Sequence, residues 1–334
     1  MEWYLPVIWA GVIGTAVMLY VILDGFDLGI AILFPTTKDE GERDQMMNSV
    51  APFWDGNETW LVLGGAGLWV AFPYAYAIIM PAFYIPVILM LLALIFRGVA
   101  FEFRWVAKPH HKIWDLAFWA GSTLAAFAQG LILGGLLQGI KVVDKQFAGG
   151  PFDWLTPFTL MCGAGVVIGY ATLGATWLVY KTDGPVAERA RRQAKALLLG
   201  LLAFAILVSL WTPYAHPRIA ARWFTPFNLM LLWPLPVLTA ICGYFAWKRL
   251  HGAHEFTPFA LTIAIFVLCF LGLAVSNYPY LVPPDLTIWD TAAAPSSHVF
   301  VLIGVSFLLP TILFYTAFVY WTFRGKVRSD SGYH

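Results

Sequence analysis

Residues 6–34 read PVIWAGVIGTAVMLYVILDGFDLGIAILF, a long apolar run whose only charged members are two aspartates near its end. A helix needs about 20 mainly apolar residues to cross a membrane, because the hydrocarbon core is about 30 Å thick and each residue rises about 1.5 Å. The run is long enough to cross and to continue beyond the core. It therefore predicts a transmembrane helix that carries charge in its last third.

The remainder of the chain has the same character. Eight further stretches are long and apolar enough to cross, at about 52–72, 77–104, 114–139, 157–180, 195–213, 226–248, 258–277 and 296–324. Of the 334 residues, 60% are hydrophobic and 12% are charged, against about 25% charged in a soluble domain. We predict an all-α, polytopic integral membrane protein with nine transmembrane helices, in which residues 1–334 form one transmembrane domain.

The connection between two of these stretches remains open from the sequence. Between the second and third stretches, Pro73, Pro81 and Pro86 allow either a tight turn or a kinked continuation of the helix. The combined length of the two stretches is too great for one span, which favours two helices.

Lys and Arg are distributed unevenly between alternate loops, and cytoplasmic loops are the ones that collect them. With the N-terminus outside, the inner segments hold Lys38, Arg43, Arg104, Lys108, Lys112, Lys181, Arg189, Arg191, Arg192, Lys195, Lys248, Arg249, Arg324, Lys326 and Arg328. The outer segments hold only Lys141, Lys145, Arg218 and Arg222. This asymmetry predicts a periplasmic N-terminus and a cytoplasmic C-terminus. The net charge of +1 offers no field that would attract nucleic acid.

Five ionisable residues fall inside the predicted spans, and they are Asp24, Asp27, Asp55, Glu58 and Arg97. Such groups are costly in a membrane and are functional candidates for that reason. Counted from the inner ends of the first three spans, Asp27, Glu58 and Arg97 lie at one depth, about 10 Å below the cytoplasmic surface. The i, i+3 spacing within each acidic pair places both carboxyl groups on one helix face. We expect the five side chains to meet between the first three helices.

One guanidinium cannot neutralise four carboxylates in a dry site, so at least one carboxyl is expected to be protonated or reached by water. A group of this kind suits proton transfer. The alternative is structural, because buried ion pairs also hold helices in register. Glu102 and Asp115 lie near helix ends and are interpreted as ordinary solvated charges.

Haem and metal ligands are missing from the interiors of the predicted spans. The histidines are His110, His111, His216, His251, His254, His298 and His334, and none is central to a span. Membrane subunits usually hold haem through His or Met, but Met18, Met90, Met161 and Met230 have no histidine with which to form an axial pair. His298 is interpreted as a satisfied interfacial histidine. The three cysteines show no CxxC or Cys/His pairing. We expect the chain itself to bind no haem and no metal.

Glycine pairs at GxxxG spacing predict close helix packing. They are Gly25/Gly29, Gly130/Gly134, Gly135/Gly139 and Gly165/Gly169. The first pair brackets Asp27 and should press the first helix against a neighbour.

Three motifs resemble those of a known family. They read LDGFDLG at 23–29, WDGNETW at 54–60 and FRGVAFEFR at 96–104, with NSVAP at 48–52 and LTIWD at 286–290 in support. In this order and spacing they resemble subunit II of cytochrome bd-type quinol oxidases over nearly the whole chain. The resemblance implies a haem-free subunit with nine helices in the bacterial inner membrane. It also implies a larger partner, subunit I, which carries haems b and d, or b only, and couples quinol oxidation to the reduction of O₂ to water.

The resemblance also assigns roles to residues. The family motifs match Asp24 and Asp27, then Trp54, Asp55 and Asn57, then Arg97, which in the family line a hydrophilic route from the cytoplasm toward the haems. In some members the residues matching Trp54 and Asp55 lie near a bound quinone, and some complexes carry a small accessory single-helix subunit. Two features depart from the family: Glu58 stands where some relatives are neutral, and the loop at 214–225 is short.

Two other functions compete with this interpretation. A proton-coupled secondary transporter would also place acids beside an arginine inside the membrane, but it favours interrupted helices in matched halves, and no such halves are visible in the sequence. A passive scaffold without a proton role is the third alternative.

Overall fold

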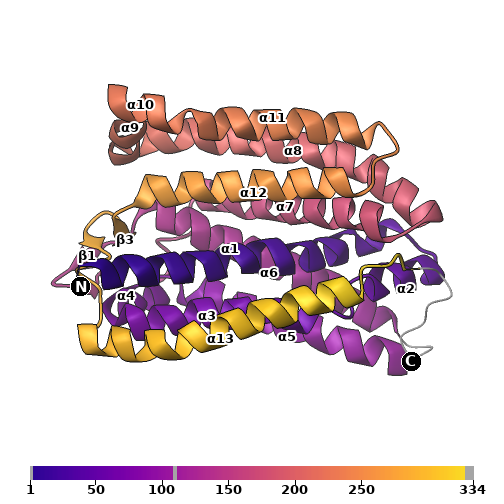
Figure 1. Cartoon of the computed structure of the whole chain (residues 1–334), viewed down its shortest axis with the longest axis horizontal. Helices are drawn as coiled ribbons and strands as arrows, with labels where there is room; N and C mark the ends of the chain where they lie inside the picture. The colour runs from indigo at the N-terminus through magenta and orange to yellow at the C-terminus, as the bar shows by residue number, and fades with distance from the viewer. Residues whose placement is uncertain (1–2, 108–110, 328–334) are drawn as a thin grey trace.

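The computed structural model describes residues 3–107 and 111–327. The chain forms a bundle of long helices that run roughly parallel or antiparallel to one another (Figure 1). Lys108, His110, Arg328 and His334 lie outside the described residues. The long helices are α1 (Tyr4–Leu33), α3 (Trp54–Ala71), α5 (Tyr84–Val106), α6 (Lys112–Gln138), α7 (Pro157–Lys181), α8 (Gly184–Ala215), α11 (Pro234–Leu250), α12 (Phe256–Asn277) and α13 (Pro295–Thr322).

Shorter elements connect the long helices. They are η1 (Phe34–Thr36), α2 (Glu40–Asn48), α4 (Pro73–Ala82), α9 (Pro217–Phe224), α10 (Pro226–Leu232) and the strands β1 (Val142–Val143), β2 (Gln146–Phe147), β3 (Tyr280–Val282) and β4 (Leu286–Thr287). The strands form two small antiparallel hairpins, β1 with β2 and β3 with β4. Both hairpins lie at the end of the bundle where α1 begins, and α13 ends at the opposite end (Figure 1).

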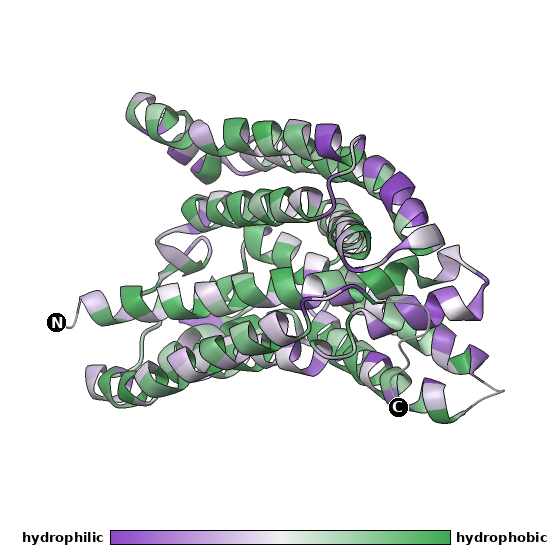
Figure 2. Cartoon of the chain, turned by 45° about the vertical axis from the view of Figure 1, so that its right-hand side comes forward, coloured by the Kyte–Doolittle hydropathy of each residue, from purple (hydrophilic) through white to green (hydrophobic). Residues whose placement is uncertain are grey.

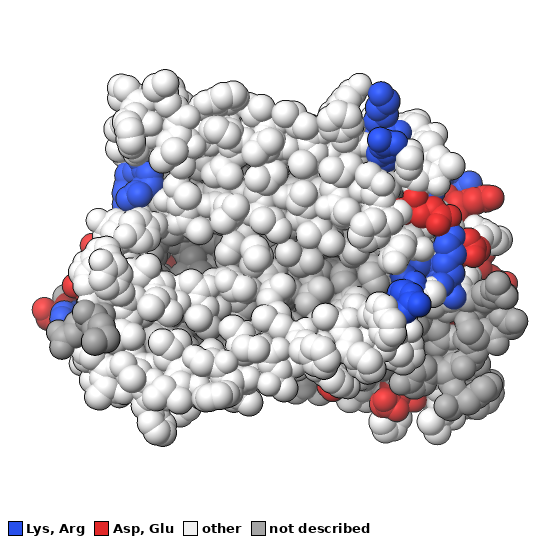
Figure 3. Space-filling view, in the orientation of Figure 1, with Lys and Arg blue, Asp and Glu red and all other residues white. Residues whose placement is uncertain are grey.

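The chain is a polytopic all-α membrane protein. Within the described residues, eight helices are long and apolar enough to cross a membrane, with α10 and α11 together forming one of them. Apolar residues follow the long helices, and polar residues gather toward the ends of the bundle (Figure 2). The charged side chains on the visible face likewise lie at the two ends, with an uncharged band between them (Figure 3).

Helix α3 is the predicted span that falls outside this set of eight. It is 18 residues long, and its first two turns carry Asp55, Asn57 and Glu58. These polar residues lower its mean hydropathy, so length and composition alone do not identify it as a span.

Prolines fix the breaks between α3, α4 and α5. The chain leaves helical geometry at Phe72, directly before Pro73, because a proline disfavours the helical conformation of the residue that precedes it. It breaks again at Phe83, between Pro81 and Pro86. The prolines therefore mark two breaks, and α4 is a short separate helix between them.

Helix starts elsewhere follow from local chemistry. The Thr156 hydroxyl accepts a hydrogen bond from the Thr159 N–H at 3.2 Å, and Pro157 occupies the first helical position of α7, where no N–H is needed. Asp39 caps α2 in the same way, because its carboxylate accepts from the Glu42 N–H at 2.9 Å.

The predicted close packing at Gly25/Gly29 is confirmed, and the neighbour is α7. A Cβ at Gly29 would lie 1.8 Å from the Tyr170 carbonyl oxygen, and a Cβ at Gly174 would lie 2.4 Å from the Gly29 carbonyl carbon. The two backbones therefore touch directly. A Cβ at Gly130 would likewise lie 2.5 Å from the Cys162 carbonyl oxygen, so α6 packs on α7 in the same way.

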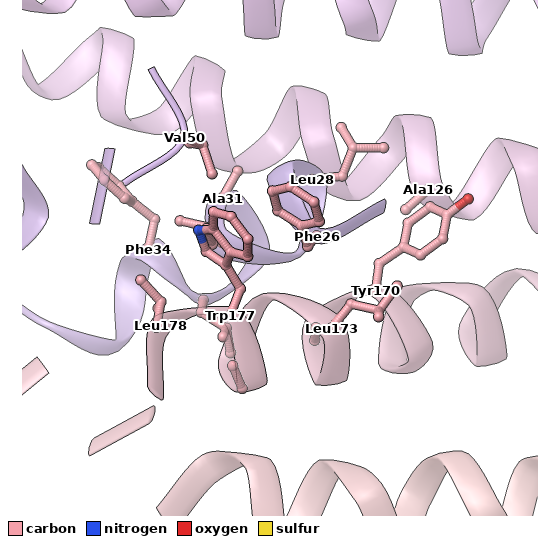
Figure 4. Close-up of a cluster of buried hydrophobic side chains, with 14 of the residues drawn as sticks. Phe26, Leu28, Ala31, Phe34, Val50, Ala126, Tyr170, Leu173, Trp177 and Leu178 are labelled. Atoms are coloured by element: carbon pink, nitrogen blue, oxygen red, sulfur yellow. The ribbon is translucent and has the colours of Figure 1, made fainter. Parts of the chain in front are cut away.

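The main hydrophobic core lies where the C-terminal halves of α1 and α7 meet. Phe26 of α1 stacks on Trp177 of α7 with 4.3 Å between ring centroids, and Figure 4 shows both side chains pointing into this cluster beside Ala31 and Leu173. This packing holds the acidic face of α1 in a fixed orientation toward α3 and α5.

Candidate functional site

Arg97 of α5 is the centre of a buried ionic cluster. Its side chain is fully buried, and its Nη2 lies 2.8 Å from Asp24 Oδ1 and 3.7 Å from Asp27 Oδ2, both on α1. Its Nη1 donates to Glu58 Oε1 of α3. Two helices, α1 and α3, therefore place three carboxyl groups around the guanidinium of a third helix, α5.

Close packing explains why these groups meet. Asp24 and Asp27 lie on one face of α1, while Gly25 and Gly29 bring that helix against α7. On α5, Arg97 is held in place by Gly121 of α6, where a Cβ would lie 2.7 Å from the Ala93 carbonyl oxygen. The cluster therefore lies within a tightly packed layer of α1, α3, α5 and α6.

A hydrogen-bonded chain leads from Asp27 to α13. Asn57 donates through Nδ2 to Asp27 Oδ2 at 2.8 Å and to the Leu23 carbonyl at 3.3 Å. The Tyr320 hydroxyl donates to Asn57 Oδ1 at 3.0 Å. The amide of Asn57 is thus fixed between an acceptor and a donor, and Tyr320 was not identified by sequence reasoning.

A second chain of polar groups lies one turn further into the membrane. Tyr20 precedes Asp24 by four residues on the same face of α1, and its hydroxyl accepts from Gln129 Nε2 at 2.8 Å. The Tyr170 hydroxyl donates to Gln129 Oε1 at 2.6 Å. Gln129 is an amide near the middle of α6, and its position inside a span was the signal that could have identified it.

The cluster keeps spare hydrogen-bonding capacity. Asp24 Oδ2, Asp27 Oδ1 and Arg97 Nε are buried and have no hydrogen-bond partner among the described residues. Glu58 differs from the two aspartates because 28% of its side chain is exposed, whereas theirs are fully buried. The cluster therefore reaches the protein surface through Glu58 on α3.

Asp55 lies outside this cluster. Its side chain is exposed, one turn before Glu58 on α3. The neighbouring Trp54 stacks on Phe101 with ring centroids 4.7 Å apart, and the Arg97 guanidinium carbon lies 5.5 Å from the Trp54 ring. The structure thus brings together Asp24, Asp27, Glu58 and Arg97, and leaves the fifth predicted member facing outward.

A second ionic cluster lies two turns nearer the C-terminal end of α5. Arg104 is almost fully buried; it donates through Nε to Asp115 Oδ1 at 2.7 Å and forms an ion pair with Asp44 of α2. Arg43 reaches the other oxygen of Asp115 at 2.8 Å. The interpretation of Asp115 as a solvated charge is therefore wrong, because two arginines converge on it and cover it. Glu102 is exposed, as expected.

Aromatic rings separate the two clusters. Phe118 of α6 packs edge-on against Phe101 at 5.0 Å and against Phe34 at 5.1 Å. The guanidinium carbon of Arg104 lies 5.4 Å from the Phe34 ring. Arg97 and Arg104 therefore lie in two polar layers on one face of α5, with an apolar layer between them.

His298 has the satisfied environment that the sequence predicts. It is buried in the first turn of α13, with Nε2 2.8 Å from the Ala71 carbonyl, and its own carbonyl accepts from Trp9 Nε1 at 3.2 Å. Among the described residues, no three His, Cys, Asp or Glu side chains are grouped so that they could hold a metal ion.

Comparison with known proteins gives one consistent family. The family model described as cytochrome bd terminal oxidase subunit II matches residues 5–323. The chain is 32% identical to cytochrome bd-I ubiquinol oxidase subunit 2 of Escherichia coli K12, over 97% of this chain and 95% of that one. It is 28% identical to cytochrome bd ubiquinol oxidase subunit 2 of Bacillus subtilis 168, over 96% of each chain.

A solved structure has the same fold. The structure of bd oxidase from Geobacillus thermodenitrificans matches with a TM-score of 0.75 and 18% identity, covering 95% of this chain and 98% of that chain.

Proposed function

This chain belongs to the cytochrome bd terminal oxidase subunit II family, and we propose that it is a haem-free subunit that lines a proton path for a haem-bearing subunit I. As a subunit II, it is part of a quinol oxidase, an oxidoreductase complex, and has a subunit I as its partner. In the proposed complex, subunit I carries haems b and d, or b only, and couples quinol oxidation to the reduction of O₂ to water.

The proposed topology has nine crossings in one transmembrane domain, with the N-terminus periplasmic and the C-terminus cytoplasmic in a bacterial inner membrane. Among the described residues, eight helices are long and apolar enough to cross, and α3 is the proposed ninth. The opposite positions of the beginning of α1 and the end of α13 support an odd number of crossings (Figure 1). The excess of Lys and Arg on one side supports the orientation.

The observation that carries the proton path is the burial of one guanidinium among three carboxyl groups. Proton exchange by Asp27 or Glu58 would relieve the excess of negative charge around Arg97. The unpartnered carboxyl oxygens of Asp24 and Asp27 could bind internal water, which buried polar groups commonly do. Oxygen reduction consumes protons, and a path from the inner side would supply them. The family membership does not favour the transporter alternative.

Replacing a carboxyl by an amide tests conduction directly, because the amide keeps the shape but cannot exchange a proton. We expect Asp55→Asn and Asp27→Asn each to assemble with a normal haem spectrum. Both should turn over quinol and O₂ at least about tenfold more slowly, because a positioned proton carrier typically accelerates a reaction by about 10²–10⁴-fold. Proton uptake from the inner face should fall in parallel. Steady-state oxygen consumption and proton uptake by reconstituted vesicles measure both effects.

The double variant and a control refine this test. If both aspartates belong to one path, the loss of turnover in the double variant should be smaller than the two single losses combined, because residues of a single route are coupled. Asp290→Asn alters an exposed aspartate of the outer loop and should leave turnover unchanged. Normal turnover and proton uptake in both single variants would leave the subunit as a scaffold. If turnover falls in Asp27→Asn but not in Asp55→Asn, protons would enter the cluster through Glu58 alone.

The partner subunit is proposed to dock on α3. The exposed stripe of this helix comprises Asp55, Thr59, Val62, Gly65, Ala66 and Trp69. An exposed carboxylate, a hydroxyl and two small residues are a poor surface for lipid but a good one for a close-packed helix. The spacing from Asp55 to Thr59, Val62, Ala66 and Trp69 follows one helix face.

Ala66→Trp is expected to prevent assembly with subunit I, because it puts a large ring where the helices would approach most closely. The haem absorbance that copurifies with the tagged chain should fall by at least about tenfold. Ala203→Trp adds the same ring to an exposed small residue of α8 and should leave assembly intact. Full haem recovery with Ala66→Trp would show that subunit I docks on another face.

Two smaller parts complete the proposal. Trp54 is half-buried and Asp55 beside it is exposed, so both side chains reach the surface at the inner end of α3, where the family resemblance suggests a bound quinone. A small single-helix accessory subunit is the other expected component. Quinone extraction and mass analysis of the purified complex would test each of them.

A further inference from the structure

A cavity of about 260 Å³ opens between the inner ends of α12 and α13. Figure 1 shows α12 and α13 on opposite sides of α1. Residues of α1 and α7 line the cavity between these two helices. Phe26, Phe53, Trp177, Phe259 and Tyr320 are among the residues that line the cavity. Most of the lining side chains are aromatic, and Leu23 and Ile263 are among the others. Trp54, which stacks on Phe101 of α5, is not one of the lining residues.

Two cations lie at this cavity without a counter-ion. Lys181 is buried at the end of α7, where its Nζ donates to the Phe323 carbonyl at 2.5 Å and the Gly325 carbonyl at 2.6 Å. Arg324 is exposed, and its Nη1 donates to the Trp321 carbonyl at 2.9 Å. Within the described part of the chain, neither cation forms an ion pair, and no acidic residue lines the cavity.

Neighbouring cations behave differently, which makes this pair distinctive. Lys326, two residues beyond Arg324, pairs with Asp183 at 2.6 Å and with Glu255 at 2.7 Å. Arg189 pairs with Glu42 at 2.5 Å. The nearby acids are thus already engaged, and the positive charge that remains free is the charge that borders the aromatic cavity.

We propose that this cavity is a binding site for an anionic phospholipid of the inner leaflet. An acyl chain fills the aromatic cavity, and the phosphate lies at its mouth against Arg324 and the remaining donor of Lys181. Both cations stand at helix ends, which is the depth of the headgroups, and apolar space of this size at a lipid-facing surface is filled by the surrounding acyl chains rather than by water. The two free cations favour a headgroup of net negative charge, such as phosphatidylglycerol, over phosphatidylcholine, whose choline ammonium neutralises its phosphate.

Photocrosslinking of the whole oxidase tests the site. The complex is placed in nanodiscs of phosphatidylcholine that contain a small fraction of phosphatidylglycerol with a photoactivatable acyl chain, and the labelled peptides are mapped by mass spectrometry. Labelling is expected on residues 256–263 of α12 and 177–181 of α7. Unlabelled phosphatidylglycerol should displace it, and phosphatidylcholine should not.

Variants separate the site from the general lipid surface. Arg324→Gln should lower labelling of these two segments about fivefold, the size expected for one cation beside an anionic headgroup. Arg191→Gln removes an inner-end arginine that donates only to the carbonyls of Gly252 and His254, and it should change nothing. Ile263→Trp fills the cavity from α12 and should also lower labelling.

The proposal fails if Arg324→Gln and Ile263→Trp label as the unaltered complex does, or if the two lipids compete equally. It also fails if mass analysis finds quinone in this cavity in place of phospholipid. None of these results bears on the proton path, because the labelling does not depend on turnover.

Discussion

Arg97→Leu is expected to abolish assembly of the oxidase. The substitution leaves Asp24, Asp27 and Glu58 facing one another without their only cation in the described cluster. Removing one partner of a buried ionic network typically costs about 3–5 kcal/mol, which is a large share of the stability of a folded protein. Copurification of subunit I and the haem absorbance of the membrane fraction measure the loss.

Suppression provides the decisive control. Adding Asp24→Asn and Glu58→Gln to Arg97→Leu removes two of the uncompensated charges and should restore part of the assembly, because groups in one network are strongly coupled. Arg222→Leu, at the outer end beside Tyr278, should be tolerated. Normal assembly of Arg97→Leu would mean that the carboxyl groups are neutral without it.

Gly29→Ala is expected to be the second most damaging change. Its new methyl group would lie 1.8 Å from the Tyr170 carbonyl oxygen and 2.9 Å from the Gly174 nitrogen, and neither backbone atom belongs to a flexible side chain. Overpacking of this kind costs typically about 1–3 kcal/mol. The thermal midpoint of the purified complex should fall, and α1 should move away from α7.

Gly11→Ala is the matched control, on the same helix with nothing within 4 Å of its added Cβ. Because alanine is the better helix former by up to about 1 kcal/mol, this variant should be neutral or slightly stabilising. Equal thermal midpoints for the two variants would show that α1 and α7 do not touch at Gly29 in the assembled complex.

The cluster around Arg97 illustrates which parts of a site a sequence can predict. Counting residues from the ends of the predicted spans places Asp27, Glu58 and Arg97 at one depth in the membrane. The structure places the three side chains together. Depth says nothing about rotation around a helix axis. Asp55 and Glu58 are three residues apart and therefore lie on the same side of α3. The rotation of α3 about its axis nevertheless lets only Glu58 reach Arg97.

Asp115 shows a second limit of prediction from the sequence, which is burial by residues from distant parts of the chain. A carboxylate in the first turn of a helix is ordinarily solvated and stabilises the helix dipole, which is why it attracted no special interpretation. Its burial depends on Arg43 and Arg104, which arrive from two other helices. The sequence carries no local sign of such a three-helix encounter.

The breaks around α4 could be predicted from the sequence, because prolines mark them. The exact residues at which the helices end could not.

The two arginines of α5 stand seven residues apart, which is about two helical turns. Each is matched to acids on different helices: Arg97 to α1 and α3, Arg104 to α2 and α6. Inserting or deleting a single residue between them would rotate one arginine about 100° away from its acids while the other stayed matched. The spacing from Arg97 to Arg104 should therefore tolerate no change in length.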